Sequence, residues 1–339
     1  MALSVGILGL PNVGKSTLFK ILTDNQVDIS NYPFCTVEPN VGVVEVPDKR
    51  LVKLAGVIKP QKIVPAAIKF IDVAGLVKGA HKGEGLGNQF LAHLRECDIL
   101  LEVVRGFKNE NIAHIDGEIN PKKDIEIIGE ELFLKDLETI EKRLEKIEKD
   151  TKQGRKEAIE EKIVLGKLKE DLSQKKDILT EDEKKKTAHL FLLTQKLLIY
   201  VFNCRGRENL EENSLTFDFK EEEEKKYFTE EERKELGVEK NSIDELIKKC
   251  YSFLNLITFF TVAGGKEVRA WPIARGSSIM KGAGMVHTDF AERFVRAEVV
   301  NWKDLIEKGS WGACAQDGIL KTVSRDYVLE DGDVIEIKV

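Results

Sequence analysis

The sequence predicts an α/β protein in which a mostly parallel, doubly wound sheet is interrupted by a helical arm and followed by a smaller α+β unit. Three observations support this fold class. Short apolar segments alternate with glycine-rich loops and helical patterns over the first 118 residues. Glutamate, lysine, leucine and isoleucine then dominate as far as residue 196. Strand patterns return at residue 197, and near the end of the chain they give way to short strands separated by glycine-rich turns.

The first predicted domain is discontinuous and combines residues 1–118 with residues 197–252. Its strands are expected at residues 5–8, 41–46, 67–71, 99–104, 197–202 and 215–219. Helical patterns between the early strands favour βαβ units, because parallel neighbours need a crossover connection. A length of 339 residues also suits two or three compact units.

Residues 119–196 are expected to form a helical coiled-coil arm inserted into that domain. One seam has the 4-3-4-3 spacing of a coiled coil and comprises Phe133, Leu137, Ile140, Leu144 and Ile147. A returning helix is expected to contribute Ile159, Ile163, Leu168 and Leu172. Gly154 is expected at the tip between the two helices.

Residues 253–339 are expected to form a small α+β domain. Strand patterns occur at residues 266–273, 295–302 and 334–339, with glycine-rich turns and a short helix after Thr288.

The composition is that of an ordinary globular protein, with 42% apolar residues, 33% charged residues and a formal net charge of −6. A nucleic-acid contact would therefore need a local basic patch. The five cysteines form no C-x-x-C pair. No apolar run approaches the roughly 18 residues of a membrane-spanning helix. We expect a soluble, cytoplasmic monomer with reduced thiols and no membrane contact.

Residues 9–16 read G-L-P-N-V-G-K-S and match the G-x-x-x-x-G-K-[ST] pattern of a P-loop. An apolar strand pattern precedes the motif and a helical pattern follows it, as the motif requires. In such a loop, backbone N–H groups surround the phosphates, the lysine reaches the β and γ oxygens, and the serine hydroxyl binds Mg²⁺. The residues expected to bind nucleotide are Asn12, Val13, Gly14, Lys15, Ser16 and Thr17.

Two further elements favour a nucleotide-dependent switch over other P-loop proteins. Asp72 ends an apolar strand and begins a D-x-x-G pattern with Gly75. This aspartate could hold Mg²⁺ through water, and the Gly75 N–H could sense the γ-phosphate. Thr36 lies in a proline-punctuated loop between the two motifs and could complete the Mg²⁺ shell beside Ser16.

Hydrolysis must be organised without the glutamine of Ras-like enzymes, because Leu76 follows Gly75. Asn12 could help to hold K⁺ near the phosphates, or it could only stabilise its own loop. Gly79, Gly83, Gly85 and Gly87 suggest a mobile second switch.

The segments GLPNVGKSTLF, NYPFCTVEPNVGVV, DVAGLVKGAHKGEGLGNQFL, KEVRAWPI and MVHTDF together resemble the YchF or Obg-like ATPase family, in order and over most of the chain. The resemblance implies a G domain interrupted by a coiled-coil arm, a C-terminal β-grasp (TGS) domain, a preference for ATP and association with ribosomes. It also implies that His114 takes part in hydrolysis. Without the resemblance, a lone histidine is more often structural.

The base-reading segment departs from the family pattern, in which N-x-x-E follows the strand at 197–202. Here Asn203 is present, but Gly206 replaces the glutamate. Asn203 could bond the adenine edge with help from the Cys204 backbone N–H. The pocket could bind ATP weakly or accept GTP as well.

Basic residues at the arm tip form a candidate ribosome or RNA contact. They are Lys146, Lys149, Lys152, Arg155 and Lys156. Acidic residues lie among them, so a salt-bridged solvent face is an equal alternative. The C-terminal domain is a second candidate, because TGS domains bind RNA or regulatory partners in several families.

The sequence supports two functions of different classes. The first is a slow, Mg²⁺-dependent ATP-hydrolysing switch that associates with the large ribosomal subunit. The second is a ribosome- or RNA-binding module in which nucleotide binding is weak and hydrolysis is vestigial. A small-molecule kinase is disfavoured, because Thr36 and the D-x-x-G pattern are switch elements and no acceptor pocket is recognisable.

Overall fold

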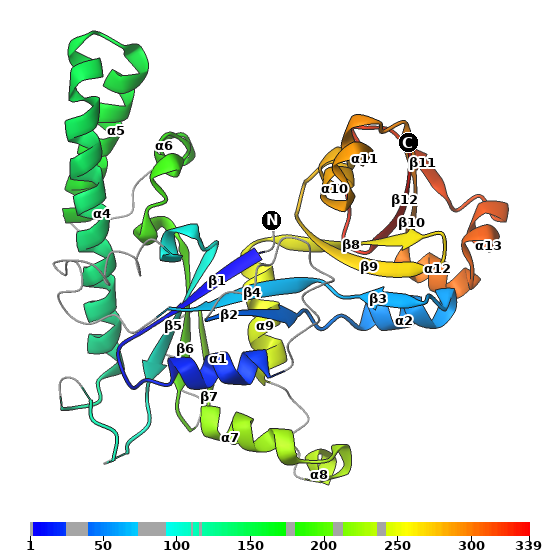
Figure 1. Ribbon diagram of the computed structural model, residues 1–339, viewed down its shortest axis with the longest axis horizontal. Helices are drawn as coiled ribbons and strands as arrows, with labels where there is room; N and C mark the ends of the chain where they lie inside the picture. Colours follow the sequence, from blue (N-terminus) through cyan, green and yellow to red (C-terminus); the bar gives the residue numbers. More distant parts are fainter. Residues whose placement is uncertain are drawn as a thin grey trace.

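A six-stranded sheet forms the nucleotide domain at the centre of the molecule (Figure 1). The computed structural model describes residues 3–24, 40–73, 93–109, 111–114, 117–173, 180–205, 213–235 and 242–339. The strand order is β2-β4-β1-β5-β6-β7, and only β2 runs antiparallel to its neighbour. The strands are β1 Leu3–Leu8, β2 Val41–Glu45, β4 Ala67–Asp72, β5 Ile99–Arg105, β6 Leu197–Asn203 and β7 Ser214–Phe217. The parallel strands are mostly apolar, as expected for a sheet that is covered on both faces.

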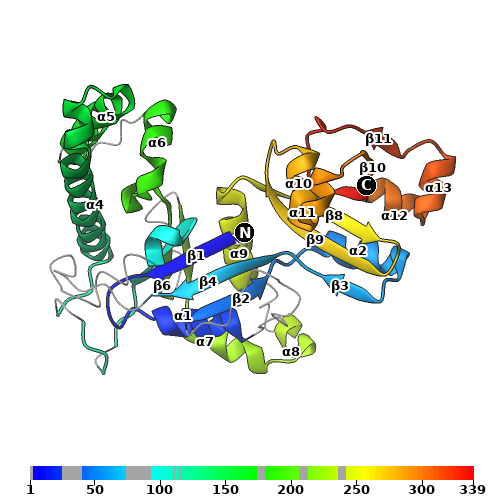
Figure 2. The same ribbon diagram turned by 45° about the horizontal axis from the view of Figure 1, so that its top comes forward.

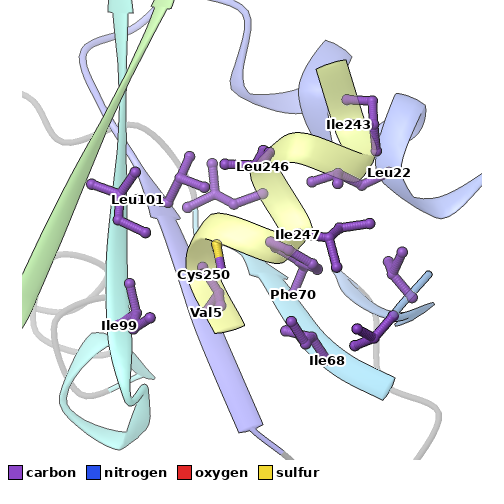
Figure 3. Packing of buried hydrophobic residues seen from close by; sticks show 14 of the residues in the cluster. Val5, Leu22, Ile68, Phe70, Ile99, Leu101, Ile243, Leu246, Ile247 and Cys250 are labelled. Atoms are coloured by element: carbon purple, nitrogen blue, oxygen red, sulfur yellow. The ribbon is translucent and has the colours of Figure 1, made fainter. Parts of the chain in front are cut away.

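The amphipathic helix α9 covers the middle of this sheet (Figure 3). Its residues Leu246, Ile247 and Cys250 are buried against Val5 of β1 and Phe70 of β4. The other helices of this part are α1 Lys15–Thr23, α7 Phe219–Glu224, α8 Glu230–Glu235 and α9 Ser242–Phe253. Full burial of such side chains contributes roughly 1.5–3 kcal/mol each, so this helix anchors the sheet although it is far from β1 in sequence.

The arm projects from one side of the nucleotide domain (Figures 1 and 2). It contains α4 Pro121–Lys152, α5 Lys156–Ser173 and α6 Glu181–Thr187. Asn120 caps α4 by accepting a hydrogen bond from the Lys123 N–H, and Pro121 occupies its first turn. At the opposite end of the helix pair, Gly154 adopts φ +76° in the turn to α5, as the sequence predicted for the tip.

The predicted seam of the returning helix is wrong in its first half. Ile159 and Ile163 are 38% and 67% exposed, whereas Leu165 and Leu168 are buried against α4. The reason is periodicity. Leu165 and Leu172 are seven residues apart and share one side of the helix, while the five-residue step from Ile163 to Leu168 breaks the 3-4 spacing. Arg143 and Glu161 join the two helices at 2.7 and 2.8 Å.

A second six-stranded sheet forms the C-terminal part, on the side of the nucleotide domain opposite the arm (Figure 2). Its order is β11-β10-β12-β8-β9-β3. The C-terminal elements are β8 Leu256–Ala263, β9 Glu267–Ala274, α10 Ile279–Val286, α11 Thr288–Glu292, β10 Arg296–Asn301, α12 Trp302–Lys308, α13 Trp311–Gln316, β11 Lys321–Val323 and β12 Asp333–Lys338.

One strand of that sheet comes from the N-terminal segment. Helix α2 (Lys49–Ile58) and strand β3 (Lys62–Val64) precede β4 in sequence, but β3 pairs in parallel with β9. Arg50 of α2 also bonds Asp331 at 2.7 Å. The predicted fold class is confirmed, and this crossing segment is the part that the sequence patterns did not indicate. In the described part of the chain, no helix is long and apolar enough to cross a membrane.

Candidate nucleotide-binding site

The site lies along the carboxyl edge of the central sheet, where the ends of the parallel strands meet. Strand β1 leads into the P-loop (residues 9–16), β4 ends at Asp72, β6 ends at Asn203, and β7 leads to Asp218. Because parallel strands place their carboxyl ends together, one edge receives all of these side chains. The P-loop, Asn203 and Asp218 border an open cavity of about 940 Å³, which we call the phosphate cavity, and Asp72 adjoins it through its hydrogen bond with Ser16.

The P-loop has a backbone that depends on its residue types. Gly14 has φ +109°, and a Cβ atom at this position would lie 2.7 Å from Asn203 Nδ2. Asn12 has φ +62°, a left-handed conformation that asparagine adopts more readily than most residues. Helix α1 begins at Lys15, directly after this turn, so its N-terminal N–H groups and dipole face the phosphate cavity.

The Lys15 ammonium lies inside the loop. It donates hydrogen bonds to the carbonyl oxygens of Gly9 at 3.0 Å and Leu10 at 2.7 Å, and the residue is only 8% exposed. Burial lowers the pKa of Lys15 from 10.5 to about 8, against the opposing effect of the negative Asp72. A bound polyphosphate would replace the lost hydration of this cation, so the group is suited to an anion.

Ser16 and Asp72 provide the hard oxygen atoms that Mg²⁺ prefers. The Ser16 hydroxyl donates to Asp72 Oδ2 at 3.2 Å. Asp72 Oδ1 is buried and has no hydrogen-bond partner among the described residues, and burial raises the pKa of this carboxyl. An orphaned buried oxygen next to a hydroxyl fits a cation or its water. The described residues contain no cluster of three or more His, Cys, Asp or Glu side chains that could hold a metal.

Asn12 reaches out of the P-loop to the segment that follows β5. Its Nδ2 donates to the carbonyl oxygen of Ala113 at 3.3 Å. The buried guanidinium of Arg105 donates to the same carbonyl at 3.4 Å and to the carbonyls of Phe107, Asn109 and Ile112 at 3.1–3.3 Å. Arg105 therefore holds the backbone at Phe107, Asn109, Ile112 and Ala113, and Asn12 joins Ala113 to the P-loop.

His114 follows Ala113 but is not among the residues that line the phosphate cavity. Its Nε2 lies 3.1 Å from Asp124 Oδ2 in the first turns of α4, and the two side chains are 5% and 3% exposed. The structure thus brings together Asn12, Gly14, Lys15, Ser16, Thr17 and Asn203 around the cavity, whereas His114 lies against the root of the arm.

Asn203, which the sequence predicts to read the base, lines the cavity. Its Nδ2 donates to the Val13 carbonyl at 3.0 Å, and its Oδ1 accepts from the Phe219 N–H at 3.2 Å. The amide therefore bridges the P-loop and the start of α7. Arg205 donates to Asp218 at 2.9 Å beside it, and Cys204 is buried.

Sequence reasoning missed Arg105, Asp218 and Phe219 at this site. All three lie at or just after the carboxyl end of a parallel strand, which is the positional signal that could have identified them. The predicted residues Thr36, Gly75, Leu76 and Gly206, with the glycines at 79, 83, 85 and 87, lie outside the described residues.

The basic residues at the arm tip are all exposed. Two of them form ion pairs on the arm itself, Lys152 with Glu148 and Arg155 with Asp150, both at 2.9 Å. Exposed pairs of this kind contribute at most about 1 kcal/mol, so they could be exchanged for other contacts.

The fold and the site together define a P-loop nucleotide-binding protein of the GTPase-like class. Two family models match. One, described as "50S ribosome-binding GTPase", covers residues 4–140, and the other, YchF-GTPase_C, described as "Protein of unknown function (DUF933)", covers residues 256–339.

Relatives that match nearly the whole chain specify the family. The chain is 44% identical to "Ribosome-binding ATPase YchF" of Bacillus subtilis, over 100% of this chain and 99% of that protein. It is 42% identical to the Escherichia coli O157:H7 protein of the same name, over 99% and 98%. The solved structure of the Schizosaccharomyces pombe YchF GTPase superposes with a TM-score of 0.85 at 35% identity, over 99% and 97%. The chain belongs to the YchF family.

Proposed function

We propose that this protein is a cytoplasmic ATPase that binds Mg²⁺-ATP in the phosphate cavity, hydrolyses it slowly and couples its nucleotide state to ribosome binding. The observation that carries this proposal is the joint geometry of Lys15, Ser16 and Asp72 on one edge of the sheet. The names of the relatives, which describe ribosome-binding ATPases, support the choice of nucleotide and partner.

Each residue of the P-loop has a distinct task in this proposal. Residues 12–17 bind the phosphates, and the Lys15 ammonium neutralises charge on the β and γ oxygens. Ser16 and Asp72 would hold Mg²⁺, the latter through water, together with Thr36. When bound, the ion would neutralise the charge that develops as the phosphoanhydride bond breaks. Gly75 would report the γ-phosphate to the second switch.

The intrinsic rate is expected to be low. Leu76 cannot orient water as a glutamine does, and the described residues that line the cavity include one arginine, Arg205, which is bonded to Asp218. His114 is proposed to assist hydrolysis only after a rearrangement, since its Nε2 contacts Asp124.

Base choice is proposed to rest on Asn203 and Cys204, with ATP preferred and GTP as the alternative. The Asn203 amide is already bonded at both ends, to Val13 and Phe219. This observation favours weak base discrimination, because an engaged amide has fewer lone pairs and protons for the base.

The test is single-turnover hydrolysis of ATP by the purified chain, with and without large ribosomal subunits. Slow turnover that subunits accelerate, and that Lys15→Ala abolishes, is the expected result. ATP binding without turnover under any condition would instead identify a nucleotide-dependent binding module. Asn12 is proposed to support K⁺ near the phosphates, so turnover should be faster in K⁺ than in Na⁺, and equal rates would remove that ion from the proposal.

The ribosome contact is proposed at the arm tip, with the C-terminal TGS-like domain as the other candidate. Charge reversal of the basic residues at the tip should weaken ribosome binding and reduce its salt dependence. These residues are Lys146, Lys149, Lys152, Arg155 and Lys156. Unchanged binding would move the contact elsewhere. We also propose that the protein is a monomer with three domains. They are the nucleotide domain at residues 1–118 and 197–252, the coiled-coil arm at residues 119–196 and the TGS-like domain at residues 253–339.

A further inference from the structure

The contact between His114 and Asp124 buries a histidine away from the phosphate cavity. The Nε2–Oδ2 distance is 3.1 Å, and neither side chain is more than 5% exposed. Asp124 belongs to the first turns of α4, the long helix of the arm. Figure 1 shows this helix running from the nucleotide domain to the arm tip. With 32 residues, α4 is about 48 Å long. A displacement of its tip therefore tilts the whole helix and moves the turn that carries Asp124.

The residue before His114 is tied to the P-loop. The Ala113 carbonyl accepts from Asn12 at 3.3 Å and from Arg105 at 3.4 Å. Two consecutive residues therefore connect the phosphate loop on one side with the arm root on the other. A change of P-loop conformation and a movement of α4 both act on the same short segment.

A buried carboxyl group lies near this connection. Glu102 of β5 is 1% exposed, and its Oε2 has no hydrogen-bond partner among the described residues. Burial raises the pKa of Glu102 well above its usual value, and the negative charge of Asp124 adds to that effect. Both effects act against ionisation of Glu102 beside the His114–Asp124 contact.

We infer that Asp124 is a positioning residue that holds His114 away from the phosphate cavity, and that displacement of the arm root releases the histidine. This inference rests on the proposed function of His114 in hydrolysis. It goes beyond that function because it assigns control of His114 to the arm, through the contact with Asp124 at the start of α4. A partner bound to the arm would raise turnover by breaking this contact.

The first experiment compares Asp124→Asn with Glu126→Gln in single-turnover ATP hydrolysis. Both changes remove one carboxylate charge from the start of α4, but Glu126 is exposed and serves as the matched control. Coupling free energies between sites typically correspond to about 5- to 150-fold, and we expect Asp124→Asn to raise the unstimulated rate about tenfold at unchanged ATP affinity. The double variant with His114→Ala should be as slow as His114→Ala alone.

A second variant loosens the same turn without touching the contact. Asn120 is exposed and caps α4, so Asn120→Ala should fray the turn that carries Asp124 and raise the rate in the same direction. Melting temperatures of all variants show whether they remain folded. If the wild-type protein hydrolyses ATP, and Asp124→Asn and Asn120→Ala are both folded but neither exceeds the wild-type rate, the inference is wrong.

Chemical labelling separates this inference from the proposed hydrolysis. Diethyl pyrocarbonate modification, followed by mass spectrometry, should spare His114 in the nucleotide-free wild type relative to His287, whose side chain is 58% exposed. His114 should become several-fold more reactive in Asp124→Asn and Asn120→Ala. If His114 is more reactive in the variants but no protein hydrolyses ATP, Asp124 does hold the histidine and the proposed role of His114 in hydrolysis is wrong. If His114 is equally reactive in all proteins, Asp124 does not hold it and the inference is wrong.

Discussion

Nucleotide affinity should fall steeply above pH 8 because of Lys15. The buried ammonium has a pKa of about 8 in the nucleotide-free protein, lowered mainly by burial. Phosphate oxygens bind the protonated form, so the apparent dissociation constant scales inversely with the protonated fraction. From pH 7 to pH 9 that fraction falls from about 0.9 to about 0.1, which predicts an affinity about tenfold weaker.

The free energy of unfolding changes with pH in the opposite direction to the ATP affinity. Because the folded pKa of Lys15 lies below the unfolded value of 10.5, the unfolded chain binds more protons between about pH 8 and 10.5. Below pH 8 the folded protein carries the full free-energy cost of burying the charged Lys15 ammonium. The free energy of unfolding of the nucleotide-free protein should therefore gain up to ~3 kcal/mol from this group as pH rises through that window.

The assay is titration with a fluorescent ATP analogue at constant ionic strength from pH 7 to pH 9.5. Adenosine serves as the control ligand, because it lacks phosphate and its affinity should not follow the Lys15 titration. Lys15→Ala should show no measurable ATP binding at any pH in this range. An ATP affinity that stays constant from pH 7 to pH 9 in the wild type would refute the assignment of the buried cation to phosphate binding.

Four substitutions test other parts of the account. Asn203→Ala should lower the free energy of unfolding by about 1–3 kcal/mol, because it leaves a buried carbonyl and a buried N–H without their partner; an unchanged urea midpoint would contradict the bridging role. Leu165→Ala should cost about 2–5 kcal/mol in the arm, while Ile163→Ala should cost less than about 0.5 kcal/mol, and equal effects in thermal unfolding would contradict the observed seam. Gly14→Ala should abolish ATP binding, since the new Cβ would lie 2.7 Å from Asn203 Nδ2. Titration with ATP measures this, and retained affinity would contradict the need for glycine at this position.

The strands of the central sheet could be predicted because each is a short apolar run between glycine-rich or helical segments. Strand β3 could not. It has only three residues, two of them exposed, and it pairs with β9 about 200 positions away. No local periodicity reports such a pairing. The seam of α5 was misassigned for a related reason, since Ile163 is as apolar as Leu165 and only the partner helix determines which is buried.

The placement of the candidate phosphate residues could be predicted, because a P-loop has fixed residue types at fixed spacing. Lys15, Ser16 and Asp72 lie together as the motifs indicated. Arg105 and Asp124 were not predicted, because their roles come from contacts that form only in the folded chain. The end of β5 marks Arg105 as a candidate by position, but neither its hydrogen bonds to four carbonyls nor the contact of Asp124 with His114 leaves a pattern in the sequence.

The most direct test of the central claim is titration of the purified protein with fluorescent ATP and GTP analogues in Mg²⁺ and K⁺, beside Lys15→Ala. The account predicts micromolar ATP binding that Lys15→Ala abolishes, with GTP bound more weakly. Equal affinities for ATP and GTP would contradict the proposed base preference. The absence of ATP binding to the wild-type protein would contradict the account as a whole.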